Sequence, residues 1–174
     1  MACEVQLVPP SALGELDNAG LAAALRPLFE DAGPLVEHLV GTPFASWDEV
    51  VDAARAAIEA MDDLERAVLL VAHPRIGADP NELARRSHMS WSEQGGDGPT
   101  STDVTARLAE LNDRYEEIFG FPFVEWMAGR PRAALVPVLE ARLARPRDVE
   151  LAAGCAALLA IAADRLARLR LGAR

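Results

Sequence analysis

Lysine is absent from this 174-residue sequence, so its 17 basic residues are all arginine, against 27 acidic residues. The formal net charge is −10. Nucleic-acid binding requires clustered basic side chains that neutralise phosphates, and an anionic membrane surface attracts the same kind of cluster. The charge balance therefore argues against nucleic acids and membrane surfaces as partners.

Cysteine is scarce as well. The two cysteines, Cys3 and Cys155, form no Cys-x-x-Cys pair, which is typical of a reducing compartment and provides no zinc site. No two of the three histidines have the spacing of metal ligands. P-loop, Gly-x-Gly-x-x-Gly and Gly-x-Ser-x-Gly motifs are also missing. We therefore expect no metal, no organic cofactor and no covalent nucleophile.

Long apolar runs are missing too. None is long enough to span a bilayer, and the opening MACEVQLVPP lacks the basic region and apolar run of a signal peptide. These observations predict a cytoplasmic protein.

Apolar helix formers are abundant. Hydrophobic residues make up 51% of the chain but aromatic residues only 5%, because alanine and leucine dominate. The length favours one domain with a sizeable core. We predict an all-α fold, a single compact domain of about eight helices over residues 1–174, with residues 1–10 as an N-terminal tail.

Capping residues, glycines and prolines set the expected helix boundaries. Ser46-Trp-Asp-Glu49 has the spacing of a capping box, and Gly120 is a typical helix end. His73-Pro74 ends another helix, because proline disfavours helix in the residue before it. The expected helices cover about 17–29, 33–40, 46 onward, 63–72, 79 onward, 102–119, 131–144 and 148–171. The segment FPFVEWMAG, residues 121–129, is expected to be extended.

Helical spacing also predicts buried faces. In the helix after Ser101, one face carries Val104, Leu108, Leu111, Tyr115 and Ile118 at steps of four and three. The loop GGDGPTST that precedes it, residues 95–102, is expected to be the most flexible part of the chain.

Polar side chains gather between two helical patterns, in AHPRIGADP and MSWSEQGGDG. His73 can cap helix carbonyls, but its side chain can also exchange protons near neutral pH. Ser90 and Glu93 have capping-box spacing, and Gln94 adds a donor and an acceptor that a capping box does not need. The alternative interpretation is an anion site at a helix N-terminus.

Arg165 lies on the apolar stripe of the last predicted helix, which also carries Leu151, Cys155, Leu158, Ala162 and Leu169. A buried guanidinium needs an anionic partner. Three interpretations stay open: an arginine that reaches the surface at the domain edge, a structural ion pair, or a receptor for a ligand carboxylate. If it is a receptor, we expect its guanidinium to be accessible at a pocket wall.

Together these motifs resemble the OHCU decarboxylases of purine catabolism over most of the chain. LLVAHPRIG is similar to the family's His-Pro-x-Leu/Ile-Gly motif, and SWSEQ matches Ser-x-x-Glu-Gln. LNDRYEEIFGFPFV is close to Asn-x-x-Tyr-x-x-x-Phe-Gly-Phe-Pro-Phe. LFEDAGPLVEHLVGTPFASWDEVVDAARAAI and LEARLARPRDVELAAGCAALLAIAADRL look like the N- and C-terminal helices of the family.

The resemblance implies a function and a site. The family decarboxylates 2-oxo-4-hydroxy-4-carboxy-5-ureidoimidazoline to (S)-allantoin without a cofactor, and it suggests a homodimer. By position, His73 and Glu93 are catalytic. The expected substrate-binding residues are Pro74, Ser90, Gln94, Phe123, Val124, Glu125, Trp126, Met127 and Arg165.

Two departures from the family pattern bear on the substrate. Glu125-Trp126-Met127 replaces an apolar residue followed by small ones, such as Ile-Cys-Ala, and GGDGP replaces Ala-Gly-Leu after Gln94. A related carboxylated heterocycle as substrate therefore stays open, as does a helical binding protein without catalysis.

Overall fold

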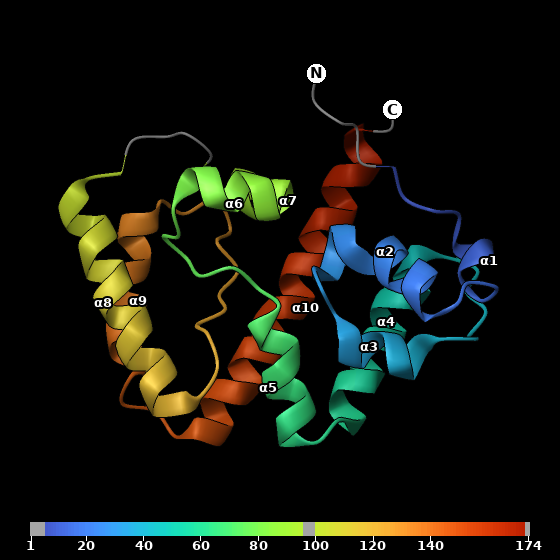
Figure 1. Cartoon of the computed structure of the whole chain (residues 1–174), viewed down its shortest axis with the longest axis horizontal. Helices are drawn as coiled ribbons and strands as arrows, with labels where there is room; N and C mark the ends of the chain where they lie inside the picture. The colour runs from blue at the N-terminus through green and yellow to red at the C-terminus, as the bar shows by residue number, and fades with distance from the viewer. Residues whose placement is uncertain (1–5, 96–99, 173–174) are drawn as a thin grey trace. The chain divides into compact units, whose positions relative to one another are not determined.

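Every regular element in the described chain is helical. The computed structural model describes residues 6–95 and 100–172, and within them it contains ten α-helices, one 3-10 helix and no strand (Figure 1). The all-α prediction is confirmed. The helices are α1 Pro10–Leu13, α2 Asn18–Phe29, α3 Gly33–Leu39, α4 Trp47–Ala60, α5 Asp63–Val71, α6 Pro80–Arg86, α7 His88–Glu93, α8 Thr102–Phe119, η1 Arg132–Ala134, α9 Leu135–Arg142 and α10 Arg147–Gly172.

The chain divides into two units. Unit 1 comprises residues 1–72 and 158–174, and unit 2 comprises residues 73–157. Helix α10 begins in unit 2 and ends in unit 1. The expectation of one domain over 1–174 stays a prediction, and its N-terminal tail falls partly outside the described residues.

Side-chain caps explain where the helices of unit 1 begin. Asp17 accepts a hydrogen bond from the backbone N–H of Gly20, and Ser46 accepts one from Glu49. The expected capping box at Ser46 is half right, because the Glu49 carboxylate accepts from the backbone of Ala45 and not from that of Ser46. A complete capping box occurs instead at α5, between Asp62 and Glu65.

The core of unit 1 forms where α3 contacts α2, α4 and α5 (Figure 1). The face of α4 predicted to be buried is buried, with Val50, Val51, Ala54 and Ile58 nearly inaccessible. Burying these apolar side chains, together with those of α2, is the main favourable term for folding of this unit.

Unit 2 is built on α8, which lies beside α9 (Figure 1). Ser101 caps α8, and Gly120 ends it in the left-handed conformation that glycine adopts without strain. Leu108, Leu111 and Tyr115 are buried as predicted. Ile118, however, is 47% exposed, so that part of the prediction is wrong.

Phe119 takes the inward position in place of Ile118. It lies four residues after Tyr115, and the two ring centroids are 4.5 Å apart. Phe121 and Phe123 pack edge-on against the same tyrosine. This aromatic cluster stabilises the turn after α8 beyond simple burial, and it accounts for the burial of Phe119 in place of Ile118.

Residues 121–129, predicted to be extended, form neither a strand nor a helix, and the chain turns at 128 and 129. The helix predicted over 131–144 begins with the 3-10 turn η1 and continues as α9. Among the helices described, we find none with the length and apolarity that a membrane span requires. Half of the loop predicted to be flexible, residues 96–99 of 95–102, lies outside the described residues.

Candidate functional site

His73 follows Ala72, the residue that caps the end of α5, so it lies near a helix end as predicted, and its side chain is buried. It is the first residue of unit 2. The chain turns at Gly77, whose φ is +85°, and a Cβ there would lie 3.0 Å from the side chain of Leu108. The segment that carries His73 therefore approaches α8 so closely that only glycine fits at this turn.

Gln94 holds this segment in place. Its side-chain oxygen accepts a hydrogen bond from the backbone N–H of Gly77 (2.9 Å), and its amide donates to the backbone oxygen of Arg75 (3.2 Å). The side chain of Gln94 is buried. The glutamine predicted to contact substrate thus joins the Ser-x-x-Glu-Gln motif to the histidine motif within unit 2.

Two further contacts fix the segment to α8. Asn112 is buried and donates to the backbone oxygen of Ile76 at 2.9 Å. Arg75 forms two hydrogen bonds with Glu116 and one with Asp113, and this pairing with carboxylates raises the pKa of its guanidinium. The histidine motif is therefore held on both sides, which limits the positions that the His73 side chain can adopt.

Helix α7 corrects the interpretation of Ser90 and Glu93. The cap of α7 is Ser87, which accepts from the backbone of Ser90; Glu93 is the last helical residue, and Gln94 follows it. Ser90 and Glu93 therefore form no capping box, and the alternative of an anion site at a helix N-terminus is wrong, because Glu93 and Gln94 lie at the C-terminal end of α7. Ser90 is buried and Glu93 is half-buried.

Glu125, one of the departures from the family pattern, forms ion pairs within unit 2. One carboxylate oxygen lies 2.8 Å from Arg130 and the other 2.8 Å from Arg142. Trp126 is 40% exposed, whereas Phe123, Val124 and Met127 are buried. No contact in the described structure joins Glu125 to the histidine segment.

A buried polar network joins α8, α9 and α10 around Glu150. Glu150 is inaccessible to solvent; it accepts hydrogen bonds from Arg142 and Tyr115, both at 2.6 Å, and pairs with Arg145. Burial, and then the hydrogen bond to Glu150, raise the pKa of Tyr115. The guanidinium of Arg142 also lies over the ring of Phe123, 4.8 Å from its centroid.

Arg165 belongs to unit 1, and its burial is confirmed. Its Nη1 lies 2.9 Å from the carboxylate of Glu30 and donates to the backbone oxygen of Leu28 at 3.4 Å. The expectation that the guanidinium is accessible is wrong: only 1% of its side chain is exposed. Of the three interpretations, the structural ion pair is the one seen within this unit.

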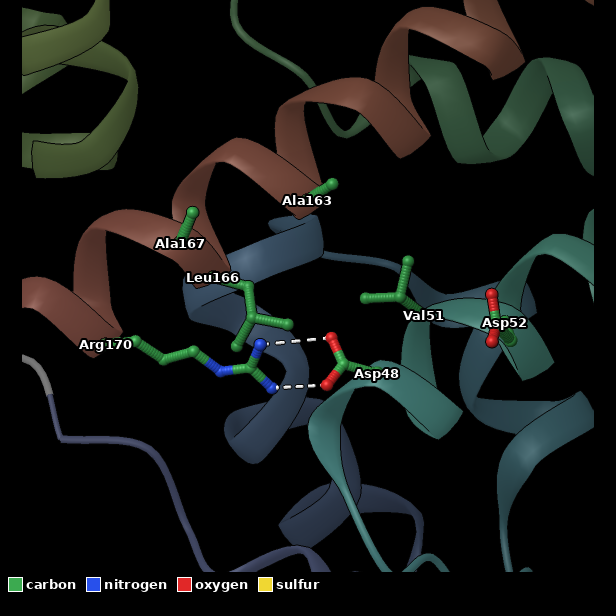
Figure 2. Close-up of a pocket in the computed structure, with 7 residues that line it drawn as sticks. All are labelled: Asp48, Val51, Asp52, Ala163, Leu166, Ala167 and Arg170. Atoms are coloured by element: carbon green, nitrogen blue, oxygen red, sulfur yellow. Dashed lines mark hydrogen bonds and ion pairs between the residues drawn. The ribbon is translucent and has the colours of Figure 1, made fainter.

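Unit 1 also contains a shallow pocket between α4 and α10 (Figure 2). Apolar side chains, among them Val51 and Leu166, line one part of it, and the exposed ion pair between Asp48 and Arg170 lines another. None of the residues predicted for the site lines this pocket. Among the described residues, no group of three or more histidine, cysteine or acidic side chains could hold a metal ion.

Sequence reasoning missed Glu30 and the network around Glu150. Glu30 lies at the end of α2, outside any apolar periodicity, so only the unusual burial of Arg165 pointed to an acid somewhere in the chain. Glu150 lies in the first turn of α10, where a carboxylate usually interacts with the helix dipole in solvent. No local signal distinguished it from such a surface acid.

Comparison with known proteins points to one family. The sequence model of the OHCU decarboxylase family matches residues 14–167. A putative 2-oxo-4-hydroxy-4-carboxy-5-ureidoimidazoline decarboxylase of Homo sapiens is 32% identical over 140 residues, which cover 78% of this chain and 81% of the human protein. The uric acid degradation bifunctional protein of Bacillus subtilis is 25% identical over 156 residues. That alignment covers 89% of this chain but only 31% of the bifunctional protein.

Two solved structures have a similar fold. One is an OHCU decarboxylase crystallised in the presence of (S)-allantoin, with a TM-score of 0.66 and 23% identity, covering 83% of this chain and 95% of that one. The other is an (S)-allantoin synthase, with a TM-score of 0.64 and 18% identity, covering 93% of this chain and 54% of that one.

Proposed function

The chain belongs to the OHCU decarboxylase family, and we propose that it converts 2-oxo-4-hydroxy-4-carboxy-5-ureidoimidazoline into (S)-allantoin and carbon dioxide. The observation that carries the proposal is the family match over residues 14–167, with the histidine and Ser-x-x-Glu-Gln motifs joined through Gln94. The human relative, named as a putative decarboxylase of this substrate, aligns with this chain over most of both sequences.

The proposed chemistry needs a group that accepts and donates a proton, and it needs no cofactor. The bond between the ring carbon and the carboxylate breaks, carbon dioxide leaves, and the electron pair moves towards the ring imine. The imine nitrogen takes up a proton from water. The hydroxyl proton is transferred to one face of the neighbouring carbon, which becomes the stereocentre. A neutral histidine can carry this proton, because its usual pKa lies near neutral pH.

Each predicted residue has a role in this proposal. His73 transfers the proton and Glu93 holds the substrate hydroxyl or orients His73. Pro74, Ser90 and the backbone of 123–127 contact the ring and the ureido group. Gln94 keeps the histidine segment in position, as its two hydrogen bonds suggest. By the family resemblance, Arg165 is assigned to the substrate carboxylate.

The proposal also covers the compartment, the oligomeric state and the cofactor requirement of the enzyme. We propose a cytoplasmic homodimer that needs neither a metal nor an organic cofactor. The scarcity of cysteine supports a reducing compartment, and the reaction sketched above uses only proton transfer.

The Glu125 departure favours no other substrate. Both of its carboxylate oxygens are within 2.8 Å of arginines, so the side chain already has partners inside unit 2. An acid with two such partners is a poor candidate for a new contact to a different heterocycle.

The test is turnover of the substrate made in place from urate by uricase and hydroxyisourate hydrolase. We expect optically active (S)-allantoin to form faster with the protein than without it, and to form equally fast after treatment with a chelator. His73→Ala should lower kcat by about 10²–10⁴-fold, the usual contribution of a general acid–base group. His88→Ala is the matched control, because His88 is exposed on α7.

Racemic allantoin at the uncatalysed rate would refute the decarboxylase assignment. Full turnover by a folded His73→Ala variant would remove His73 from the mechanism, and activity that chelation abolishes and zinc restores would refute the cofactor-free reaction.

A further inference from the structure

Arg132 is buried in unit 2, and no described acid pairs with it. It lies in η1 and is 6% exposed, and its Nη1 donates to the hydroxyl oxygen of Thr100 at 3.4 Å. Its Nε and Nη2 are buried, and within the described residues neither nitrogen has a hydrogen-bond partner. Burial lowers the pKa of this guanidinium, whereas hydrogen bonding to Glu116 raises that of Arg75. A buried cation without an anionic partner is costly, so an anion would stabilise this part of the fold.

The two nitrogens without partners form one edge of the Arg132 guanidinium. The same edge of Arg75 holds Glu116, with Nε 2.6 Å from one carboxylate oxygen and Nη2 2.7 Å from the other. Two parallel N–H donors match two oxygens of a carboxylate or a phosphate group. Arg132 therefore presents the edge that already binds an oxyanion elsewhere in the same unit.

The start of α8 adds positive potential beside this edge. Thr100, which accepts from Arg132, directly precedes Ser101, the cap of α8. Ser101 accepts from the backbone N–H of Val104, which leaves the earlier N–H groups of the first turn without a partner inside the helix. The dipole of this 18-residue helix favours an anion at the same end. Two groups that attract anions thus meet at one place.

The site lies close to the surface. Both neighbours of Arg132 in the sequence are exposed, and so are the two residues that follow Thr100. Asp103, the acid in the first turn of α8, is exposed as well, and it makes no hydrogen bond to Nε or Nη2 of Arg132. An anion can therefore reach the guanidinium through small side-chain movements, without unfolding of the helices.

We propose that unit 2 has a binding site for a small oxyanion, in which the Nε and Nη2 edge of Arg132 binds two oxygens beside the first turn of α8. The ligand is a carboxylate or a phosphate, since both present two oxygens to such an edge. The inference goes beyond the proposed function and does not rest on it, because none of its measurements needs turnover.

The first experiment measures anion binding to the full chain by isothermal titration calorimetry, with phosphate and acetate as probes. The wild type should bind one of these anions at a site that Arg132→Met weakens about tenfold or more, the effect of losing hydrogen bonds to a charged group. Tighter binding of phosphate identifies a phosphate group as the ligand, and tighter binding of acetate identifies a carboxylate. Chloride at equal ionic strength should bind more weakly than the better of the two, because it cannot place two oxygens on the edge.

The matched control is Arg114→Gln, which removes an exposed arginine from α8. It changes the net charge as Arg132→Met does, so it reports any general attraction of anions to the chain. Its affinity for phosphate and acetate should equal that of the wild type.

The second experiment uses thermal stability, where the proposal predicts a reversal. In a buffer without oxyanions, Arg132→Met should melt at or above the wild-type temperature, because it removes a buried charge that no described acid balances. Once the tighter-binding anion exceeds its Kd tenfold, the wild type should gain about 3 °C or more by mass action and become the more stable protein. The variant should gain only what Arg132-independent salt effects supply.

Three outcomes would overturn the site. The first is a folded wild type that binds neither phosphate nor acetate, which would mean that the charge of Arg132 is balanced within the chain. The second is unchanged affinity in Arg132→Met, which would place the anion elsewhere. The third is an equal effect of chloride, which would indicate screening instead of a two-oxygen contact.

Discussion

The two units of the chain bury charge in different ways. In unit 1 one acid, Glu30, meets one helical arginine, Arg165, and the acid lies on a strained turn. In unit 2 one acid, Glu150, meets two arginines and a tyrosine, all on unstrained backbone. The first contact joins the end of α2 to α10, whereas the second involves α8, α9 and the start of α10.

The elements joined in unit 2 explain why this unit needs more than one pair. Tyr115 is on α8, Arg142 on α9 and Glu150 on α10. Arg142 also forms an ion pair with Glu125, which lies in the irregular segment before η1. That segment has neither a helix nor a sheet to supply its hydrogen bonds. Its position is therefore set by side chains, and charge-assisted hydrogen bonds are the strongest that side chains form.

The comparison of the two units predicts that the stability of unit 2 depends strongly on Glu150. Glu150→Gln keeps the volume and removes the charge, which leaves the buried Arg142 with Glu125 as its one remaining acid in the network and removes the acid that pairs with the partly exposed Arg145. We expect the free energy of unfolding to fall by about 3–5 kcal/mol, the usual cost of breaking a buried pair by removing one partner. Urea denaturation followed by circular dichroism measures it. A loss below about 1 kcal/mol would mean that the network does not carry the stability of this unit.

A smaller effect is expected at Tyr115. Tyr115→Phe removes one hydrogen bond to a charged acceptor, a change that costs about 1.5–3 kcal/mol. The cost should depend on pH. Burial, and then the hydrogen bond to Glu150, raise the pKa of Tyr115 above its ordinary value of about 10. The stabilisation is therefore complete below that value and is lost as pH rises towards the pKa of the folded state.

The pH dependence can be measured directly. The advantage of wild type over Tyr115→Phe in urea denaturation should shrink above pH ~10. Since the chain contains one tyrosine, ultraviolet absorbance of phenolate reports this residue alone, and its titration in the folded protein should be displaced to higher pH. Titration at the ordinary value would contradict the burial and hydrogen bonding described for Tyr115.

Local chemistry made most of the fold predictable. Caps such as Asp17, Ser46 and Ser101 place helix starts from short-range hydrogen bonds that the sequence displays directly. The periodicity of α10 likewise predicted that Arg165 is buried. Where two local signals conflicted, the prediction failed: Ile118 fitted the stripe, but packing around Tyr115 favoured Phe119.

The site was less predictable because its contacts are distant in sequence. Gln94 bonds to backbone atoms 17 and 19 residues earlier, and Glu30 lies 135 positions before Arg165. No periodicity relates such positions. Ser90-x-x-Glu93 shows the opposite error, since a sequence pattern with capping spacing occurs inside a helix that Ser87 already caps.

The smallest effect is expected at the exposed pair in unit 1, which isolates burial as the cause of the difference. Arg170 donates to both oxygens of Asp48, at 3.0 and 2.8 Å (Figure 2). These charge-assisted hydrogen bonds lower the pKa of Asp48. Both side chains, however, are about half or more exposed, so water and salt screen their attraction.

Asp48→Asn should therefore shift the melting temperature by less than about 2 °C, and the shift should vanish in 1 M salt, whereas the effect of Glu150→Gln should persist there. Thermal melts of the two variants at low and high salt make the measurement. Equal losses in both variants would show that hydrogen-bond geometry, and not burial, decides what a carboxylate–arginine pair contributes in this protein.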